Sequence, residues 1–270
     1  MTVNSEKPIG IFDSGIGGLT VANAINKKMP GEKLIYFGDT AHLPYGDKSA
    51  DSIKYYSIRI AQFLIDNNCK AIVIACNTAS SLAFETVKDF VGDKALVFNV
   101  IDPVVEKVTS FGMSKIGVIG TKGTIKSNVY ATKIKEIQQN AKVASVATPL
   151  LAPMIEEGFF NNKISKSIIN SYLSSTKLKN IDALILACTH YPLIKPEIEE
   201  YYNKKVNILD SAEIVAEHVK KVLNHKGILN SESKPLNHHF YVSDFTESFE
   251  QSTRFFFKNK IHLEQVSIWK

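Results

Sequence analysis

The sequence of 270 residues predicts an α/β fold made of two similar, doubly wound domains related by pseudo-symmetry. Short β-branched runs alternate with stretches of helical periodicity, which is typical of parallel sheets with right-handed crossovers. A strand-like run that ends in a glycine turn occurs at residues 8–18 and again at 115–120. A run that ends in cysteine occurs at 71–76 and again at 183–188. Two copies of one α/β layout are the simplest explanation of both recurrences.

The first half contains the clearest series of predicted elements. An apolar run leads into the turn Asp13-Ser14-Gly15-Ile16-Gly17-Gly18, and apolar residues recur after it at helical spacing. A second strand, a helix with one apolar face and a third strand follow. The predicted strands are 8–12, 33–37 and 71–75, and the predicted helices lie within 19–29 and 53–64.

The second half repeats this layout and is followed by a tail. Residues 115–121 parallel the first strand and its glycine turn, and residues 183–189 parallel 71–77. Asp210-Ser211 is a good start for a helix over 212–222. The tail from Pro235 onward offers strand-like runs at 238–242 and 261–269, around an apolar helix containing Phe249 and residues 255–257. We expect this tail to pack against the first half.

Composition excludes several classes of protein. Apolar residues make up 44% of the chain and charged residues 22%, which indicates a globular protein with a sizeable core. No apolar run approaches the roughly 20 residues that span a bilayer, so we expect no membrane partner. Residues 1–8 lack the apolar run of a signal peptide. Three cysteines cannot all pair within one chain, so we expect a reducing, cytoplasmic setting.

The net charge of +5 is spread along the chain and does not indicate a nucleic-acid partner. Only Arg59 and Arg254 are arginines among the 32 basic residues. Bidentate recognition of bases and phosphates depends on arginine, and the chain has no block of about five like charges. We therefore expect no nucleic-acid binding, although a mild attraction for small anions remains.

Cys76 and Cys188 are the candidate catalytic residues. Each follows a buried-type strand, and ligands of parallel α/β sheets bind beyond the carboxyl ends of the strands. If the two halves face each other, one thiol stands on each side of a shared cleft. Two acid/base groups on opposite faces of one carbon are what racemisation requires. A buried cysteine is also a common small hydrophobe, so a structural role stays open for either thiol alone and is expected for Cys69.

Asp13 and His190 are candidate assistants of these thiols. An unperturbed thiol has a pKa of about 8.5 and is mostly protonated near neutral pH, so a cysteine base needs help. Asp13 ends the first strand, and His190 lies two residues beyond Cys188. An imidazolium favours a thiolate, and a carboxylate favours a neutral thiol or handles its proton. In the alternative reading Asp13 caps the next helix and His190 bonds a backbone carbonyl.

The glycine turns do not match cofactor motifs. Residues 15–18 lack the third glycine of a dinucleotide fingerprint, and residues 120–124 lack the Gly-Lys-Ser/Thr of a Walker loop. Exposed backbone N–H groups and hydroxyls remain as carboxylate binders. The predicted binders are Ser14, Asn77, Thr78, Thr121, Thr124 and Thr189. A metal site is an alternative that no compact ligand pair supports; its candidate ligands are Cys76, Cys188, His190 and His42.

The turns and cysteines belong to four longer motifs, GIFDSGIGGLTV at 10–21, FGDTAHLPYG at 37–46, ACNTA at 75–79 and ACTHYPL at 187–193. In this order they resemble the signatures of the glutamate racemases of the aspartate/glutamate racemase family. A weaker echo lies at 240–244. The first and last motifs also distinguish the chain from the related aspartate racemases.

The resemblance implies a cofactor-independent enzyme that interconverts L- and D-glutamate with neither pyridoxal phosphate nor metal and supplies D-glutamate for peptidoglycan synthesis. It implies that Cys76 takes the α-proton of D-glutamate and Cys188 that of L-glutamate, with Asp13 and His190 assisting. A family glutamate falls within 153–158, where we choose Glu156 over Glu157. The implied substrate-binding residues are Asp13, Ser14, Tyr45, Gly46, Asn77, Thr78, Thr121, Thr124, Thr189 and His190.

The resemblance also implies two α/β domains with the active site in the cleft between them. We place residues 1–98 and 211–270 in the first domain and residues 99–210 in the second. A homodimer is expected by the same likeness.

Two other functions stay open from the residues alone. A one-thiol relative, such as a decarboxylase or another isomerase, would tolerate the loss of Cys76 or Cys188. A two-lobed amino-acid-binding protein would leave the α-proton of bound glutamate unexchanged.

Overall fold

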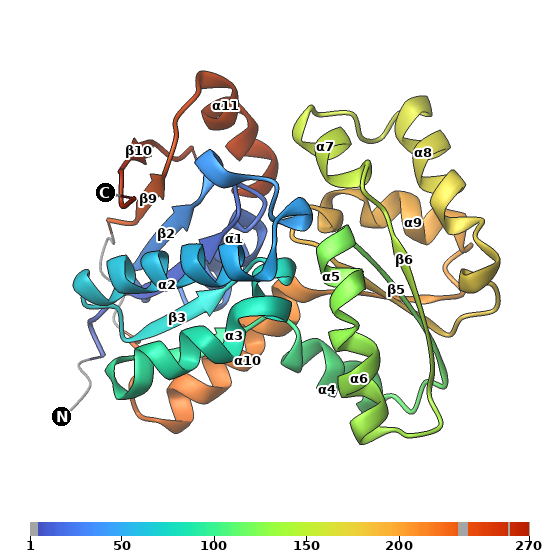
Figure 1. Ribbon diagram of the computed structural model, residues 1–270, viewed down its shortest axis with the longest axis horizontal. Coiled ribbons are helices and arrows are strands. Elements are labelled where there is room, and N and C mark those ends of the chain that lie inside the picture. Colours follow the sequence, from blue (N-terminus) through green and yellow to red (C-terminus); the bar gives the residue numbers. More distant parts are fainter. Residues whose placement is uncertain (1–4, 232–236, 259, 270) are drawn as a thin grey trace.

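The computed structural model describes residues 5–231, 237–258 and 260–269, which form two α/β domains side by side (Figure 1). Each domain is a parallel sheet with helices on its faces, so the predicted fold class is confirmed. No helix in the described ranges is both long and apolar enough to cross a membrane.

The first domain has, within the described residues, a six-stranded parallel sheet in the order β10-β9-β2-β1-β3-β4. Its central strands are buried on both faces, as expected for continuous apolar runs in a parallel sheet. The strands are β1 (Ile9–Asp13), β2 (Leu34–Gly38), β3 (Ala71–Ile74), β4 (Leu96–Asn99), β9 (His239–Val242) and β10 (Leu263–Gln265).

Two pairs of helices cover this sheet. One apolar core lies under α1 and α10, and a second lies under α2 and α3. The helices of this domain are α1 (Leu19–Lys28), α2 (Ala50–Asp66), α3 (Asn77–Val91), α10 (Ser211–His225) and α11 (Glu247–Phe256). Short 3₁₀ turns are η1 (Thr40–His42), η2 (Tyr45–Asp47) and η3 (Gly92–Lys94).

The second domain repeats the first on a smaller scale. Its strand order in the described chain, β6-β5-β7-β8, matches β2-β1-β3-β4, so β1 corresponds to β5 and β3 to β7. The strands are β5 (Lys115–Gly120), β6 (Lys142–Ala147), β7 (Ala183–Ala187) and β8 (Asn207–Asp210). The helices are α4 (Asp102–Ser110), α5 (Lys122–Ser127), α6 (Val129–Ile137), α7 (Leu151–Glu156), α8 (Lys163–Leu173) and α9 (Lys195–Tyr201), with 3₁₀ turns η4 (Thr176–Leu178) and η5 (Tyr191–Ile194).

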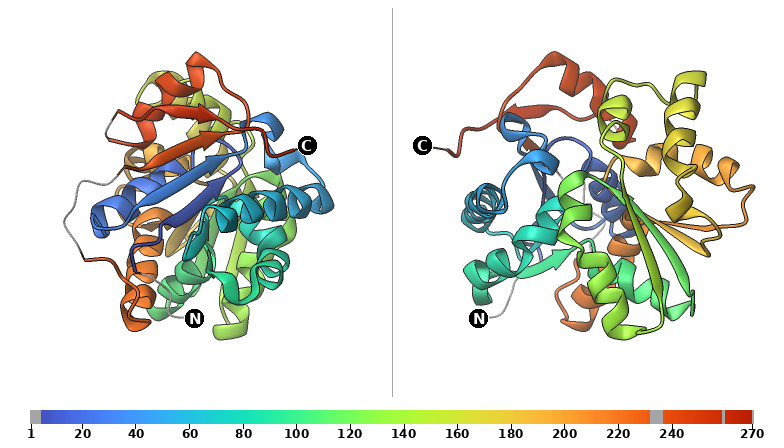
Figure 2. Two further views of the ribbon diagram at one scale, coloured as in Figure 1. Left: turned by 90° about the vertical axis from the view of Figure 1, so that its left-hand side faces the viewer. Right: turned by 45° about the vertical axis from the view of Figure 1, so that its right-hand side comes forward.

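The C-terminal tail returns to the first domain, as predicted. Strand β9 pairs in parallel with β2, and β10 pairs with β9 at the sheet edge, where Figure 2 shows the red tail beside the blue strands. The predicted strand 261–269 is wrong in extent, because only three residues of β10 find partners on the short β9. The carbonyl of Ile268 instead accepts hydrogen bonds from Arg59. Pro235, where the tail was predicted to begin, lies outside the described residues.

The predicted domain boundaries fall close to the points where the chain passes from one sheet to the other. Strand β4 of the first sheet ends at Asn99, and β8 of the second sheet ends at Asp210, directly before α10. The division at these positions stays a prediction.

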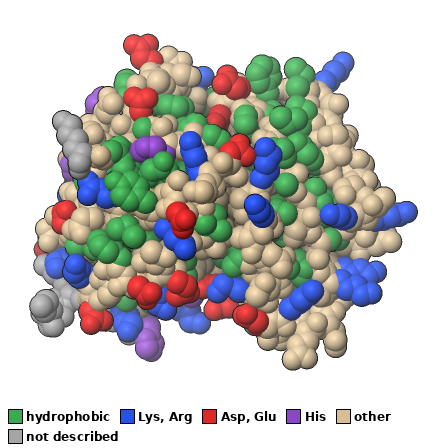
Figure 3. Space-filling model, in the orientation of Figure 1, with side chains coloured by type: hydrophobic (Ala, Val, Ile, Leu, Met, Phe, Trp, Pro, Cys, Tyr) green, Lys and Arg blue, Asp and Glu red, His purple; other side chains and the backbone are tan. Residues whose placement is uncertain are grey.

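On the face drawn in Figure 3, Lys and Arg side chains gather over the right-hand side, which is the second domain. This arrangement adds a positive field on that side of the molecule.

Candidate active site

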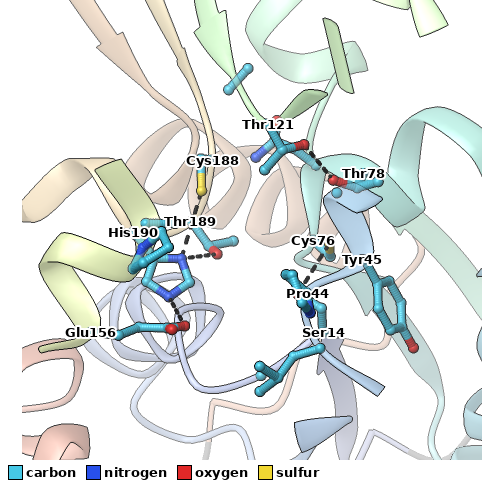
Figure 4. A pocket seen from close by; sticks show the side chains of 17 residues that line it. Ser14, Pro44, Tyr45, Cys76, Thr78, Thr121, Glu156, Cys188, Thr189 and His190 are labelled. Carbon is cyan, nitrogen blue, oxygen red and sulfur yellow. Dashed lines mark hydrogen bonds and ion pairs between the residues drawn. The ribbon is translucent and has the colours of Figure 1, made fainter. Parts of the chain in front are cut away.

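The two thiols enter one pocket from equivalent positions of the two domains. Cys76 follows β3, and Cys188 follows the corresponding strand β7. Each is 5% exposed, and both line the same pocket, where Figure 4 shows them on opposite sides. Most of the other predicted site residues also line it: Ser14, Tyr45, Gly46, Asn77, Thr78, Thr121, Glu156, Thr189 and His190.

Cys76 is held at the N-terminus of α3. Its Sγ accepts a hydrogen bond from the N–H of Ala79 at 3.5 Å. Its S–H donates to the hydroxyl oxygen of Ser14, with 3.7 Å between sulfur and oxygen. Burial raises the pKa of Cys76 to about 12, and the nearby charge of Asp13 acts in the same direction. Cys76 therefore keeps its proton near neutral pH.

Cys188 lies beside an imidazole and a carboxylate. His190 Nδ1 is 3.6 Å from Cys188 Sγ, and His190 Nε2 is 2.7 Å from Glu156 Oε1. Burial alone would lower the pKa of His190, but the hydrogen bonds and charges of Cys188 and Glu156 outweigh it and hold the pKa well above its usual value. Burial would raise the pKa of Glu156, but the bond to His190 lowers it. The charged forms of His190 and Glu156 therefore stabilise each other.

Glu157, the other candidate glutamate, lies away from these groups. Its side chain is exposed, and it is not among the residues that line the pocket. Adjacent residues at the end of a helix face different directions, so one glutamate reaches His190 and the next faces solvent.

Asp13 lies behind the pocket surface. It is completely buried and does not line the pocket, and its Oδ2 accepts hydrogen bonds from the N–H groups of Gly18 at 2.9 Å and Gly15 at 3.3 Å. These contacts fix the glycine turn before α1, but Asp13 is not the cap that the alternative supposes, because the N-cap of α1 is Gly18 and no side chain caps the helix there. Burial raises the pKa of Asp13, whereas the charge of His190 acts to lower it. Asp13 Oδ1 is buried and has no hydrogen-bond partner among the described residues.

Threonine hydroxyls join the two domains along one side of the pocket. Thr78 Oγ1 of the first domain lies 2.8 Å from Thr121 Oγ1 and 3.2 Å from Thr124 Oγ1 of the second. Thr124 is buried behind this contact and does not line the pocket. Gly46 lies so close to Thr121 that an added Cβ would be 2.8 Å from the threonine Cβ. A glycine here allows the domains to approach closely.

Asp39 is a buried polar residue of this region to which the sequence patterns alone give no role. Its completely buried carboxylate accepts hydrogen bonds from Tyr45 and Ser243, both at 2.7 Å, and lies 2.9 Å from His42 Nδ1. His42 therefore lies beside Asp39 and not in the pocket lining. The FGDTAHLPYG motif made Asp39 visible, but its partner Ser243 is 204 residues away.

The pocket therefore combines two thiols with hydroxyl and amide side chains. Such donors stabilise negative charge that develops on a bound carboxylate. No lysine is among the residues found to line it. Within the described ranges, no group of three or more His, Cys, Asp and Glu side chains is placed to hold a metal ion.

Comparison with known proteins identifies relatives along nearly the whole chain. The family model for Asp/Glu/Hydantoin racemase matches residues 19–219. The glutamate racemase of Geobacter metallireducens is 42% identical over 264 residues, which cover 97% of each chain. The crystal structure of glutamate racemase from Francisella tularensis in complex with D-glutamate has a TM-score of 0.91 at 39% identity and covers 98% of this chain and 99% of its own. A glutamate racemase of Bacillus anthracis has a TM-score of 0.90 at 34% identity, with 98% of each chain covered. With matches of this length and identity, the chain belongs to the Asp/Glu/Hydantoin racemase family, and the relatives it resembles are glutamate racemases.

Proposed function

We propose that this protein interconverts L- and D-glutamate by two-base proton transfer at the α-carbon, with Cys76 and Cys188 as the two bases. The observation that carries the proposal is that both thiols line one pocket from opposite sides. A carbon held between them loses its proton to one sulfur and gains a proton from the other on its opposite face. The relatives named above support glutamate as the substrate.

The surroundings of the thiols suit the conversion of L- to D-glutamate from the resting state. Protonated His190 carries its charge 3.6 Å from Cys188 Sγ, where it stabilises a thiolate. The Cys188 thiolate removes the α-proton of L-glutamate. Cys76, whose burial keeps it protonated, delivers its proton to the other face.

The reverse reaction uses the same groups with the protons exchanged. After one turnover Cys76 is the thiolate and Cys188 the thiol. The N–H of Ala79 and the hydroxyl of Ser14 are placed to stabilise the negative sulfur of Cys76. Asp13 acts on Cys76 through its charge, because it lies outside the pocket lining.

The remaining parts of the proposal follow from the family likeness. The reaction needs neither pyridoxal phosphate nor metal, because the two thiols move the proton and the pocket's donors stabilise the charge spreading into the α-carboxylate. We propose that the product D-glutamate serves peptidoglycan synthesis, and that the protein is a cytoplasmic homodimer.

The test is incubation of L-glutamate with the purified protein in deuterated water, with no added cofactor. Proton NMR follows the loss of the α-proton signal, and polarimetry follows the loss of optical rotation. We expect both to proceed in the wild-type protein. A protein that binds glutamate without exchanging its α-proton would be a binding protein, and the proposal would be wrong.

Single alanine variants of the two cysteines test the two-base scheme. Cys76→Ala and Cys188→Ala should each abolish racemisation of both enantiomers, because each direction needs both sulfurs. Cys69→Ala is the matched control, since Cys69 is also a buried free thiol but does not line the pocket. Near-normal turnover in either active-site variant would favour a one-thiol mechanism.

A further inference from the structure

Tyr130 of the second domain reaches across the cleft to a pocket residue of the first domain. It lies in the first turn of α6 and is 2% exposed. Its hydroxyl donates a hydrogen bond of 2.7 Å to Oδ1 of Asn77, the first residue of α3. Asn77 is also 2% exposed and lines the pocket next to Cys76.

The local backbone explains how Tyr130 reaches this position. Asn128 has a left-handed conformation (φ 57°) and joins α5 to α6. Asparagine tolerates this conformation better than most residues. The resulting bend lets Thr121 and Thr124 contact Thr78, while Tyr130 contacts Asn77 next to it.

The hydrogen bond fixes which atom of the Asn77 amide is free. A side-chain amide has one acceptor oxygen and one NH₂ donor, and the buried phenol needs an acceptor for its hydrogen. Oδ1 accepts from Tyr130, whereas Asn77 Nδ2 is buried and has no hydrogen-bond partner in the described part of the chain. Burial raises the pKa of Tyr130, so the phenol remains a donor. A buried donor without an acceptor is unfavourable unless a ligand satisfies it.

We propose that Tyr130 is a positioning residue that orients the amide of Asn77, so that Nδ2 donates to a carboxylate of bound glutamate. This inference rests on the proposed function and adds a role for the second domain. Without the phenol hydroxyl the amide is free to turn its oxygen toward the carboxylate. The pocket then loses a donor and presents an acceptor that repels the substrate.

The test compares Tyr130→Phe with Tyr202→Phe. The control also removes a buried tyrosine hydroxyl, and that hydroxyl has no hydrogen-bond partner among the described residues. We expect Tyr130→Phe to raise KM for both enantiomers about fivefold to tenfold and to change kcat by less than about threefold, since one oriented hydrogen bond is lost. The control should match the wild type. An unchanged KM in Tyr130→Phe would overturn the inference.

A double-mutant cycle separates positioning from general packing. If Tyr130 acts through the amide, Tyr130→Phe should have no further effect on KM in an Asn77→Ala background. Equal fold-changes in both backgrounds would mean that Tyr130 merely packs the domains together, and the inference would be wrong.

Asn77→Asp provides a test that does not depend on Tyr130→Phe folding well. The aspartate keeps an acceptor for Tyr130 but lacks the donor, so KM should rise more than about tenfold. An unchanged KM would contradict the inference. Calorimetric titration with D-glutamate tests the positioning role separately from racemisation. Even if neither the wild type nor any variant racemises glutamate, weaker binding by Tyr130→Phe than by the wild type supports the positioning role. Equal binding overturns that role.

Discussion

At the scale of single residues, Glu156 stabilises the positive charge of His190 beside the Cys188 thiol. Its carboxylate is 2.7 Å from His190 Nε2 and helps to hold the pKa of His190 well above its usual value. Glu156→Gln keeps the shape but removes this charge-assisted bond, which is worth about 1.5–3 kcal/mol. We expect racemisation to slow by about 10- to 100-fold. Initial rates in both directions measure the effect.

The pH dependence of Glu156→Gln tests whether Glu156 acts by raising the pKa of His190. The proposed mechanism uses protonated His190, so we expect the rate to fall at alkaline pH as His190 loses its proton. Removing Glu156 lowers the pKa of His190, and the alkaline limb of kcat/KM should therefore move to lower pH. Glu157→Gln is the control, because Glu157 is exposed and outside the pocket, and its profile should match the wild type. A Glu156→Gln profile that superimposes on the wild type would contradict this role.

Some site residues were visible in the sequence because a local rule places them, and others were not. Cys76 and Cys188 follow strands of a parallel sheet, so their arrival at the cleft follows from the strand pattern. The choice between Glu156 and Glu157 rested on the resemblance, because the strand pattern does not fix the direction of α7. Tyr130 lies 53 residues from its partner Asn77, and no periodicity links them.

At the scale of elements, buried strands and amphipathic helices were predicted best. Strands β1, β2 and β3 fall within about one residue of their predicted bounds, because continuous apolar runs occur where both sheet faces are covered. The edge strand β10 was predicted too long. Apolar composition near Ile268 and Trp269 reflects packing on helix α2 and not strand pairing.

A buried ion pair fastens several elements of the first domain. Lys70 Nζ, at the start of β3, is 2.6 Å from Glu32 Oε2, and both side chains are almost completely buried. Lys70 also donates to the carbonyl of Ile228 just after α10, and Glu32 accepts from the N–H of Asn230. Burial raises the pKa of Glu32 and lowers that of Lys70, so desolvation opposes the charged pair.

Glu32→Gln should therefore destabilise the protein strongly. It leaves the ammonium of Lys70 buried without its counter-charge, which costs about 3–5 kcal/mol, seen as a lower midpoint of urea unfolding. The double variant Glu32→Gln with Lys70→Met removes both charges and should recover much of the loss. Additive effects of the two substitutions would show that the pair is not coupled.

At the scale of the whole molecule, the pseudo-symmetry brings two equivalent strand ends together across one cleft. The sequence repeat predicted two similar domains, and the strand orders β2-β1-β3-β4 and β6-β5-β7-β8 agree with it. The contacts between domains were not predictable. The hydroxyl of Thr20, for example, donates to the carbonyl of Thr189, 169 residues away, and helical spacing alone marks Thr20 merely as part of α1.

Asp39 links the C-terminal tail to the pocket. The buried carboxylate binds Tyr45, which lines the pocket, and Ser243, which directly follows β9. Asp39→Ala removes the hydrogen bonds to three side chains, worth about 1 kcal/mol for each partner. We expect a loss of about 3 kcal/mol in the free energy of unfolding. We also expect a rise in KM for glutamate, because the turn η2, here called the Tyr45 loop, is held less firmly.

Ser243→Ala separates these two effects. It removes the bond that Ser243 donates to Asp39 and the acceptor of the Ala41 N–H, but it leaves Asp39 bound to Tyr45 and His42. We expect a loss of about 2 kcal/mol in the free energy of unfolding, measured with urea, and a KM within about twofold of the wild type. If Ser243→Ala raises KM as much as Asp39→Ala does, the tail itself shapes the pocket. If Asp39→Ala leaves KM unchanged, the Tyr45 loop is held by its other contacts, and Asp39 serves stability alone.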